Sequence, residues 1–354
     1  MGHVPQAGGA DAAERPLSGG GIGPSGAGRA DGGDERAAGG GGGAGGPLGP
    51  DFRHAVPPGG YVWWYVDGLS DDGRHGITLI AFIGSVFSPY YYWAGRARPE
   101  NHICLNVALY GPRARWSMTE RREGALRRDA TSFTLGPSAL RWEGGELIVD
   151  IDERAVPHLS PIRGRVRLIP TAMNARAFAL DAGGRHFWRP IAPAARVEVA
   201  MDSPAQNWSG AGYLDMNWGA APIERDFARW DWSRAALGRG RSAILYDAAR
   251  RDGSDLSLAL RFDAQGRLDE VAPPPRADLP RTLWRVPRRV QTDDPATLRE
   301  VRRLEDAPFY ARAELRTRLF GEDGHAVHET LDADRFAARW VKLLLPWRMP
   351  RAFF

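Results

Sequence analysis

Short apolar segments separated by turn residues run through the chain from Tyr61 to about residue 330. The first, YVWWYVDG at 61–68, enters an Asp-Gly turn, and the apolar segment 76–86 returns from it. Short strands at regular spacing with Gly and Pro turns are typical of antiparallel barrels and sandwiches. No helical pattern of note precedes residue 331, so the sequence predicts an all-β chain. The pattern runs twice, which predicts two tandem β units over residues 52–201 and 202–354.

The first 51 residues differ in composition from the rest of the chain. Residues 1–50 hold 19 of the 43 glycines and no Phe, Trp or Tyr. Such a segment buries too little apolar surface to offset the entropy lost on ordering, so we predict a disordered tail over residues 1–51. The letters GIGPSG at 21–26 fit a dinucleotide-binding fingerprint. We assign them to the low-complexity tail, because no strand precedes them and no helix follows.

The segment Leu331–Leu345 is predicted to form a helix that Pro346 ends. Four large apolar side chains fall on one face of this helix: Phe336, Trp340, Leu343 and Leu344. Two interpretations are open. In the one that we favour, the helix closes the second barrel. In the other, it is a basic, Trp-bearing helix that lies on a membrane surface.

The sequence lacks the features of an export signal or a membrane-spanning helix. The N-terminus has no apolar core before a cleavage site, and the longest apolar run, Ile77–Phe87, is too short to cross a bilayer. We therefore expect a protein on the cytoplasmic side that associates peripherally with the membrane. The C-terminal helix would supply this contact in the second of its two interpretations. The net charge of +4 is not concentrated in a basic stripe outside that helix, so no nucleic-acid partner is expected.

Residues 207–234, NWSGAGYLDMNWGAAPIERDFARWDWSR, hold a dense aromatic cluster around one carboxyl group, Asp215. The aromatic members are Trp208, Tyr213, Trp218, Trp230 and Trp232. Such a cluster lines a core or a pocket. An Asp in it must either bond strong donors or keep its proton, because an ionised carboxylate loses its hydration on burial. We predict that Asp215 is a protonated acid facing an apolar ligand, with Trp208, Trp218 and Trp232 binding that ligand.

Two short motifs flank the predicted junction of the β units. His186 and Trp188 are two residues apart, as are Tyr213 and Asp215, so on strands each pair leaves the same face. We expect the two pairs to face one another across a cleft between the units. Each residue also has a structural interpretation. His186 would be a satisfied polar group, Trp188 part of the core and Tyr213 a loop cap. Asp215 would accept a hydrogen bond from an indole N–H or from the backbone of residues 217–218. No His, Cys or acidic cluster has metal-site spacing, so no metal is expected.

Four segments together carry a resemblance to a known family: YVWWYVDG, RHFWRPIAP, GYLDMNWG and RWDWSR. Over residues 52–345 the chain resembles the carotenoid 1,2-hydratases (hydroxyneurosporene synthases) of photosynthetic bacteria. It is more distantly similar to the wider set of double lipocalin-like β-barrel proteins. The resemblance implies two tandem lipocalin-like domains, hydration of the terminal 1,2 double bond of an acyclic carotenoid, and no cofactor. It also implies that His186, Trp188, Tyr213 and Asp215 form the acid–base group.

The mechanism expected from these residues passes through a tertiary carbocation. Asp215 donates a proton to the less substituted carbon, and His186 or Tyr213 bonds to Asp215, resupplies its proton and holds the attacking water. The faces of Trp188 and Trp218 stabilise the cation.

Several alternatives remain open from the sequence. Asp231 and Glu143 are the next candidates for the acid. Two other functions fit an apolar barrel: a non-catalytic lipid or terpenoid carrier, and a terpenoid cyclase or isomerase that uses the same cation chemistry without water.

Overall fold

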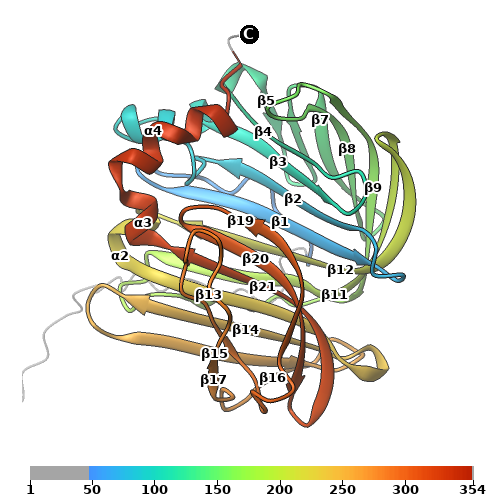
Figure 1. Cartoon of the computed structure of the whole chain (residues 1–354). Helices are drawn as coiled ribbons and strands as arrows, with labels where there is room; N and C mark the ends of the chain where they lie inside the picture. The colour runs from blue at the N-terminus through green and yellow to red at the C-terminus, as the bar shows by residue number, and fades with distance from the viewer. Residues whose placement is uncertain (1–47, 353–354) are drawn as a thin grey trace, which may run out of the picture. The chain divides into compact units, whose positions relative to one another are not determined.

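The computed structural model describes residues 48–352 (Figure 1). Most of the predicted tail, residues 1–47, lies outside the described part. The described residues 48–51 lie against the folded chain, since the carbonyl oxygen of Gly49 accepts a 2.7 Å hydrogen bond from Arg189. Residues 48–352 belong to one compact unit.

The larger sheet has twelve strands, paired antiparallel throughout. Its strands are β1 (Tyr61–Ser70), β2 (Gly76–Ile83), β3 (Ile103–Tyr110), β4 (Arg115–Arg121), β5 (Leu126–Arg128), β6 (Ser132–Leu135), β7 (Ser138–Glu143), β8 (Glu146–Arg154), β9 (Pro161–Ala172), β10 (Phe178–Ala179), β11 (His186–Ser203) and β12 (Ala205–Gly219). Their order is β4-β3-β2-β1-β12-β11-β9-β8-β7-β6-β5, and β10 pairs with β11.

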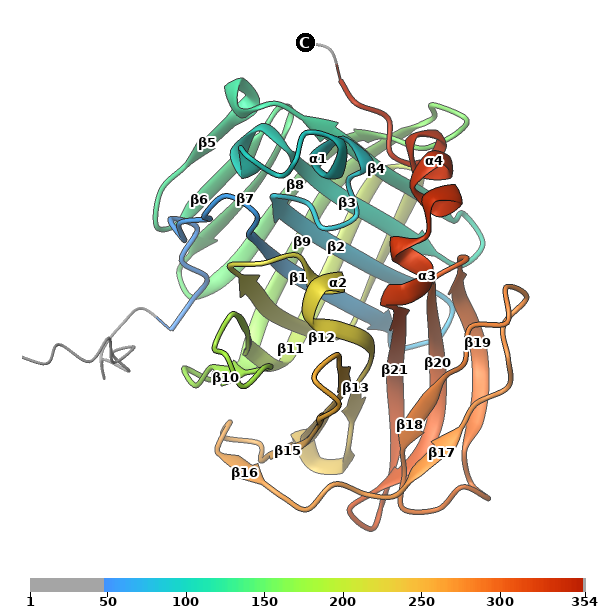
Figure 2. The ribbon, with the colours of Figure 1, turned by 90° about the vertical axis from the view of Figure 1, so that its left-hand side faces the viewer.

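The smaller sheet has seven antiparallel strands in the order β16-β15-β14-β13-β21-β20-β19. They are β13 (Phe227–Ala236), β14 (Ser242–Arg250), β15 (Asp255–Phe262), β16 (Leu268–Glu270), β19 (Arg299–Asp306), β20 (Tyr310–Leu319) and β21 (Glu322–Asp332), and a separate ribbon joins β17 (Arg276–Asp278) to β18 (Arg289–Gln291). Both sheets are curled, and the smaller lies below the larger in Figures 1 and 2. The prediction of an all-β architecture of antiparallel sheets with a short C-terminal helical segment is confirmed.

The chain changes sheet later than the sequence pattern suggested. β11 and β12 form one long hairpin within the larger sheet, and its turn falls at the predicted junction of the two units, around residues 202–205. The chain reaches the smaller sheet only at β13, after α2 (Ile223–Asp226). The segment with Tyr213 and Asp215 therefore belongs to the same sheet as His186. The division into two domains between residues 201 and 202 stays a prediction.

The predicted C-terminal helix is present as two helices, α3 (Ala333–Ala337) and α4 (Arg339–Arg348). The backbone of Ala338 between them is extended, with ψ of 134°. The axis of α4 therefore has another direction than that of α3, and the predicted apolar face is not continuous across the two helices. Phe336 is consequently buried, whereas the three apolar residues assigned to the same face are exposed: Trp340, Leu343 and Leu344. The prediction that Pro346 ends the helix is wrong, because the N–H of Met349 still bonds the carbonyl of Leu345 across that turn.

The remaining helical pieces are short. They are α1 (Pro89–Trp93) and the 3-10 turns η1 (Pro99–Asn101), η2 (Glu123–Ala125) and η3 (Gly238–Gly240).

The larger sheet is apolar on both faces, and the strand period of two separates them. On β1, Val62 and Trp64 point into a core enclosed by the larger sheet itself. Trp63 and Tyr65 point to the other side, into a second core shared with the smaller sheet. β12 alternates in the same way, which places Tyr213 in this second core. The functional site is built on this shared face.

Candidate active site

A cavity of about 920 Å³ lies between the two sheets, with walls from both sheets and from α4. The wall residues that matter for its chemistry are Trp63, Tyr65, Asp215, Trp230, Trp232, Tyr246 and Glu329, with Leu344 and Trp347 from α4. Ligand sites are typically apolar and aromatic cavities with a few polar groups. This one suits a largely apolar ligand that meets a small number of carboxyl and hydroxyl groups.

Asp215 is buried in the cavity wall, with 4% of the residue exposed. Its Oδ2 accepts two hydrogen bonds of 2.9 Å, one from the indole N–H of Trp188 and one from the hydroxyl of Tyr213. Its Oδ1 has no hydrogen-bond partner among the described residues. Two donors therefore fix one oxygen and leave the other to carry a proton.

Burial raises the pKa of the Asp215 carboxyl well above its ordinary value, because the charged form loses hydration. The bonds from Trp188 and Tyr213 act in the opposite direction, and the charges of Glu329 and Asp67 raise the pKa further. Because burial dominates, the structure favours a neutral carboxylic acid facing an apolar cavity.

Trp188 and Tyr213 lie behind Asp215, and neither is part of the cavity wall. Both are fully buried, and the Trp188 ring packs against Phe178 and Tyr246 with centroids 5.6 and 5.3 Å apart. The geometry assigns them to positioning the acid. It gives no support for the expected contact of the Trp188 face with a cation.

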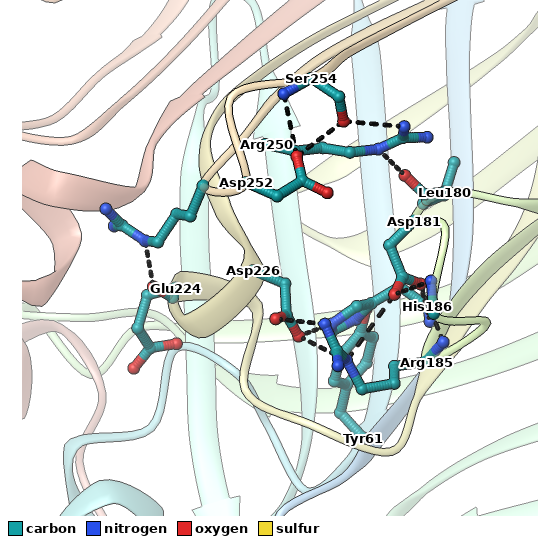
Figure 3. A network of polar contacts seen from close by, with 12 residues as sticks. Tyr61, Leu180, Asp181, Arg185, His186, Glu224, Asp226, Arg250, Asp252 and Ser254 are labelled. Carbon is teal, nitrogen blue, oxygen red and sulfur yellow. Dashed lines mark hydrogen bonds and ion pairs between the residues drawn. The ribbon is translucent and has the colours of Figure 1, made fainter.

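His186 lies in a separate polar network (Figure 3). Its Nδ1 is 3.0 Å from the hydroxyl of Tyr61, its Nε2 is 2.8 Å from Oδ2 of Asp226, and its backbone N–H donates to Asp181. Burial lowers the pKa of His186, partly offset by the bond to Asp226. None of the hydrogen bonds within residues 48–352 joins His186 to Asp215, and the ring is not in the cavity wall.

The expected arrangement of the two motifs across a cleft is wrong. β11 and β12 are neighbours in one sheet, and Trp188 is the pairing partner of Asn217. The motifs therefore meet side by side, so Trp188 can bond Asp215 laterally. The bond to Asp215 that was expected from either His186 or Tyr213 is made by Tyr213.

The three Trp residues predicted to bind the ligand lie in different places. Trp232, on β13, is in the cavity wall, with its ring centroid 5.3 Å from that of Tyr213. Trp208 and Trp218 pack against the enclosed core of the larger sheet, on the far face of β12. Their separation from Asp215 along the strand is odd, which explains why they point away from it.

The other candidate acids lie outside the cavity. Asp231 lies between Trp230 and Trp232 on β13, and its side chain points to the face of the strand away from the cavity. It accepts a hydrogen bond from the hydroxyl of Thr330. Burial raises its pKa to about 6. Glu143 is exposed and pairs with Arg141.

Tyr65 and Glu329 are wall residues that sequence reasoning missed. Tyr65 is the pairing partner of Asp215 on β1, and Glu329 is the partner of Trp232 on β21. The period of two in YVWWYVDG would have placed Tyr65 on the face of Trp63. No local signal marks Glu329, because its neighbours in space are distant in sequence.

Within residues 48–352, no group of three or more His, Cys, Asp or Glu side chains has the geometry to hold a metal ion. In the same range no helix combines the length and hydropathy needed to span a bilayer.

Comparison with known proteins gives a consistent result. The family model described as carotenoid hydratase CrtC matches residues 79–353. An acyclic carotenoid 1,2-hydratase from Thiocapsa roseopersicina is 50% identical over 92% of this chain and 84% of its own length. Proteins of the same name from Rubrivivax gelatinosus and Cereibacter sphaeroides are 50% and 45% identical, covering 85% and 77% of this chain and 76% and 98% of their own lengths.

Among solved structures, the fold is similar to that of a Nitrosomonas europaea protein assigned as AttH. The TM-score is 0.53 at 16% identity, and the match covers 77% of this chain and 92% of that chain.

Proposed function

The chain belongs to the carotenoid hydratase family, and we infer that it adds water to the terminal double bond of an acyclic carotenoid. The observation that carries the mechanism is Asp215, a buried carboxyl with a raised pKa in an aromatic cavity. Hydration of an isolated trisubstituted alkene needs an acid strong enough to make a tertiary carbocation. A neutral carboxyl group placed against an apolar substrate is such a donor.

Protonation is the first step. Asp215 gives its proton to the less substituted carbon, and positive charge develops on the tertiary carbon. The donors Trp188 and Tyr213 stabilise the carboxylate that is left on Oδ2. The face of Trp232 in the cavity wall is placed to stabilise the cation, an interaction worth about 2 kcal/mol when desolvated.

Water capture completes the reaction. The oxygen of a water molecule bonds to the tertiary carbon, one of its protons leaves, and the product is a 1-hydroxy carotenoid. No electrons are transferred to or from the substrate, so we propose that the enzyme works without a cofactor. The apolar wall limits competing reactions by excluding bulk water.

Incubation of the purified protein with neurosporene or lycopene tests the function. A more polar product, heavier by one water, is expected. Unchanged pigment that stays bound would indicate a carrier, and a product of unchanged mass would indicate an isomerase or cyclase; either result would overturn hydration.

The pH dependence of the rate follows from the raised pKa of Asp215. The acid must be protonated to act, so kcat/KM is expected to hold through the pH range in which an ordinary Asp titrates and to fall only as pH rises through the raised pKa of Asp215. An ordinary Asp, with a pKa near 3.9, would lose its proton and the activity well below neutral pH. Rates measured from about pH 3 to about pH 9 distinguish the two. A fall complete by about pH 5 would exclude a buried acid.

We propose that α4 contacts the membrane from the cytoplasmic side. Trp340, Leu343 and Trp347 are 48%, 66% and 79% exposed, although large apolar side chains are usually covered. Leu344 and Trp347 also line the cavity, so this surface adjoins the substrate site. An apolar substrate dissolved in a bilayer would then reach the cavity without crossing water.

Loss of apolar residues on α4 is expected to weaken membrane binding. The double variant Leu343→Ser and Trp347→Ser should bind anionic phospholipid vesicles about tenfold or more weakly in a sedimentation assay, since each buried side chain contributes about 1.5–3 kcal/mol. Val301→Ser is the matched control, because Val301 is 52% exposed on β19 and not in the cavity wall. Equal sedimentation of both variants and the native protein would contradict the proposal.

A further inference from the structure

A second carboxyl group, Glu329, lies in the cavity wall opposite the sheet that carries Asp215. It comes from β21 of the smaller sheet. Its Oε1 is 2.7 Å from the hydroxyl of Tyr65 and pairs with the guanidinium of Arg312. None of the hydrogen bonds in the described part of the chain uses its Oε2, which leaves this oxygen available to a molecule in the cavity.

Glu329 belongs to a buried cluster of ion pairs. Arg312 is 1% exposed and bonds both Glu329 and Asp67, the latter at 3.0 Å. Arg234 pairs with Asp67 from the other side. Two guanidinium groups therefore balance two carboxylates in a buried cluster, and charge-assisted bonds hold Glu329 in one position.

Asp215 has different surroundings: among residues 48–352, its carboxyl group is bonded only by the neutral donors Trp188 and Tyr213. Two carboxyl groups in one cavity, one neutral and one ion-paired, are the arrangement that divides acid and base roles. Tyr65 connects the two, because it is the strand partner of Asp215 and its hydroxyl bonds Glu329.

Glu305 is the other glutamate in the cavity wall, and it fits the base role less well. Its carboxyl accepts a hydrogen bond from Tyr110, and burial raises its pKa. It has no ion pair with an Arg among residues 48–352.

We propose that Glu329 binds the attacking water and removes its proton as the carbocation is captured. The proposal rests on the hydration mechanism above. After Asp215 has protonated the alkene, the water oxygen forms a bond to the tertiary carbon and the O–H bond breaks toward Oε2 of Glu329. The product leaves as the neutral alcohol. Proton exchange with water then returns Glu329 to the carboxylate and Asp215 to the acid.

The test is Glu329→Gln assayed with an acyclic carotene in heavy water. Hydration is expected to fall at least about 100-fold, because a general base contributes about 10²–10⁴-fold. Protonation by Asp215 does not need Glu329, and the cation can return its proton. The recovered alkene should therefore gain deuterium, whereas Asp215→Asn should give neither alcohol nor labelled alkene.

Glu314→Gln is the matched control. Glu314 is a buried glutamate of β20, ion-paired with Arg302 and outside the cavity wall, so this variant should hydrate at the native rate. Hydration at the native rate by Glu329→Gln would overturn the role of Glu329 as the base. It would not affect the proposed role of Asp215 as the acid. Loss of both hydration and label by a Glu329→Gln protein with native melting temperature would also overturn it, because the carboxylate would then be needed before water capture.

Discussion

Asp215→Asn is expected to lower hydration by about 10²–10⁴-fold, the usual contribution of a general acid. Asn keeps the shape of Asp and can still accept hydrogen bonds from Trp188 and Tyr213, but it carries no transferable proton. The fold should be retained, since the variant places no new charge in the core. The measurement is product formation per unit of folded protein, with circular dichroism to establish folding.

Asp231→Asn is the control for this variant. Asp231 is also buried and also has a raised pKa, but it lies on the far face of β13 from the cavity. Its replacement should leave hydration close to the native rate. If Asp215→Asn is active and Asp231→Asn is inactive, Asp231 and not Asp215 is the proton donor.

Arg312→Met is expected to destabilise the protein by about 3–5 kcal/mol, the cost of removing one partner from a buried ion pair. The side chain of Arg312 is almost fully buried. Within the described part of the chain, its loss leaves Glu329 without an ion-pair partner and Asp67 with Arg234 alone. Urea unfolding measures the change.

Arg163→Met gives the comparison for Arg312. Arg163 forms an exposed ion pair with Asp152 at 2.8 Å, and exposed pairs contribute little because water and salt screen them. A much smaller change is expected for this variant. Similar losses from both variants would mean that the buried cluster has no special role in stability.

Alternation along strands was the part of the site that the sequence predicted best. The spacing of two between Tyr213 and Asp215 placed them on one face, and the structure brings them together through a hydrogen bond. The same rule excludes Trp218 from that face, because it is three residues from Asp215. The density of aromatic residues in 207–234 therefore does not by itself show which of them face the cavity.

Contacts between distant segments could not be predicted in this way. Glu329 enters the cavity because β21 pairs with β13, whose own residues are far away in the sequence. The imidazole of His186 lies within hydrogen-bonding distance of the carboxyl group of Asp226, the last residue of α2. The alternation of side chains along a strand does not predict such a contact. The family resemblance predicts the architecture and the reaction. It does not predict which side chains from distant strands contact one another.

The break in the C-terminal helix has the same kind of cause. Phe336 packs into the core between the sheets, and the extended Ala338 then redirects α4 so that Trp340 and Trp347 remain exposed. The periodicity of 331–345 fits a single helix equally well. The turn at Ala338 accompanies the packing of Phe336, Val341 and Leu345 into the core between the sheets, which a helical period does not encode.

Hydration in heavy water tests the central claim most directly, namely that an acid in exchange with solvent protonates the alkene. The native enzyme should place one non-exchangeable deuterium on the carbon next to the new alcohol, seen by mass spectrometry and NMR of the product. An alcohol that carries no deuterium at that carbon would contradict protonation by Asp215.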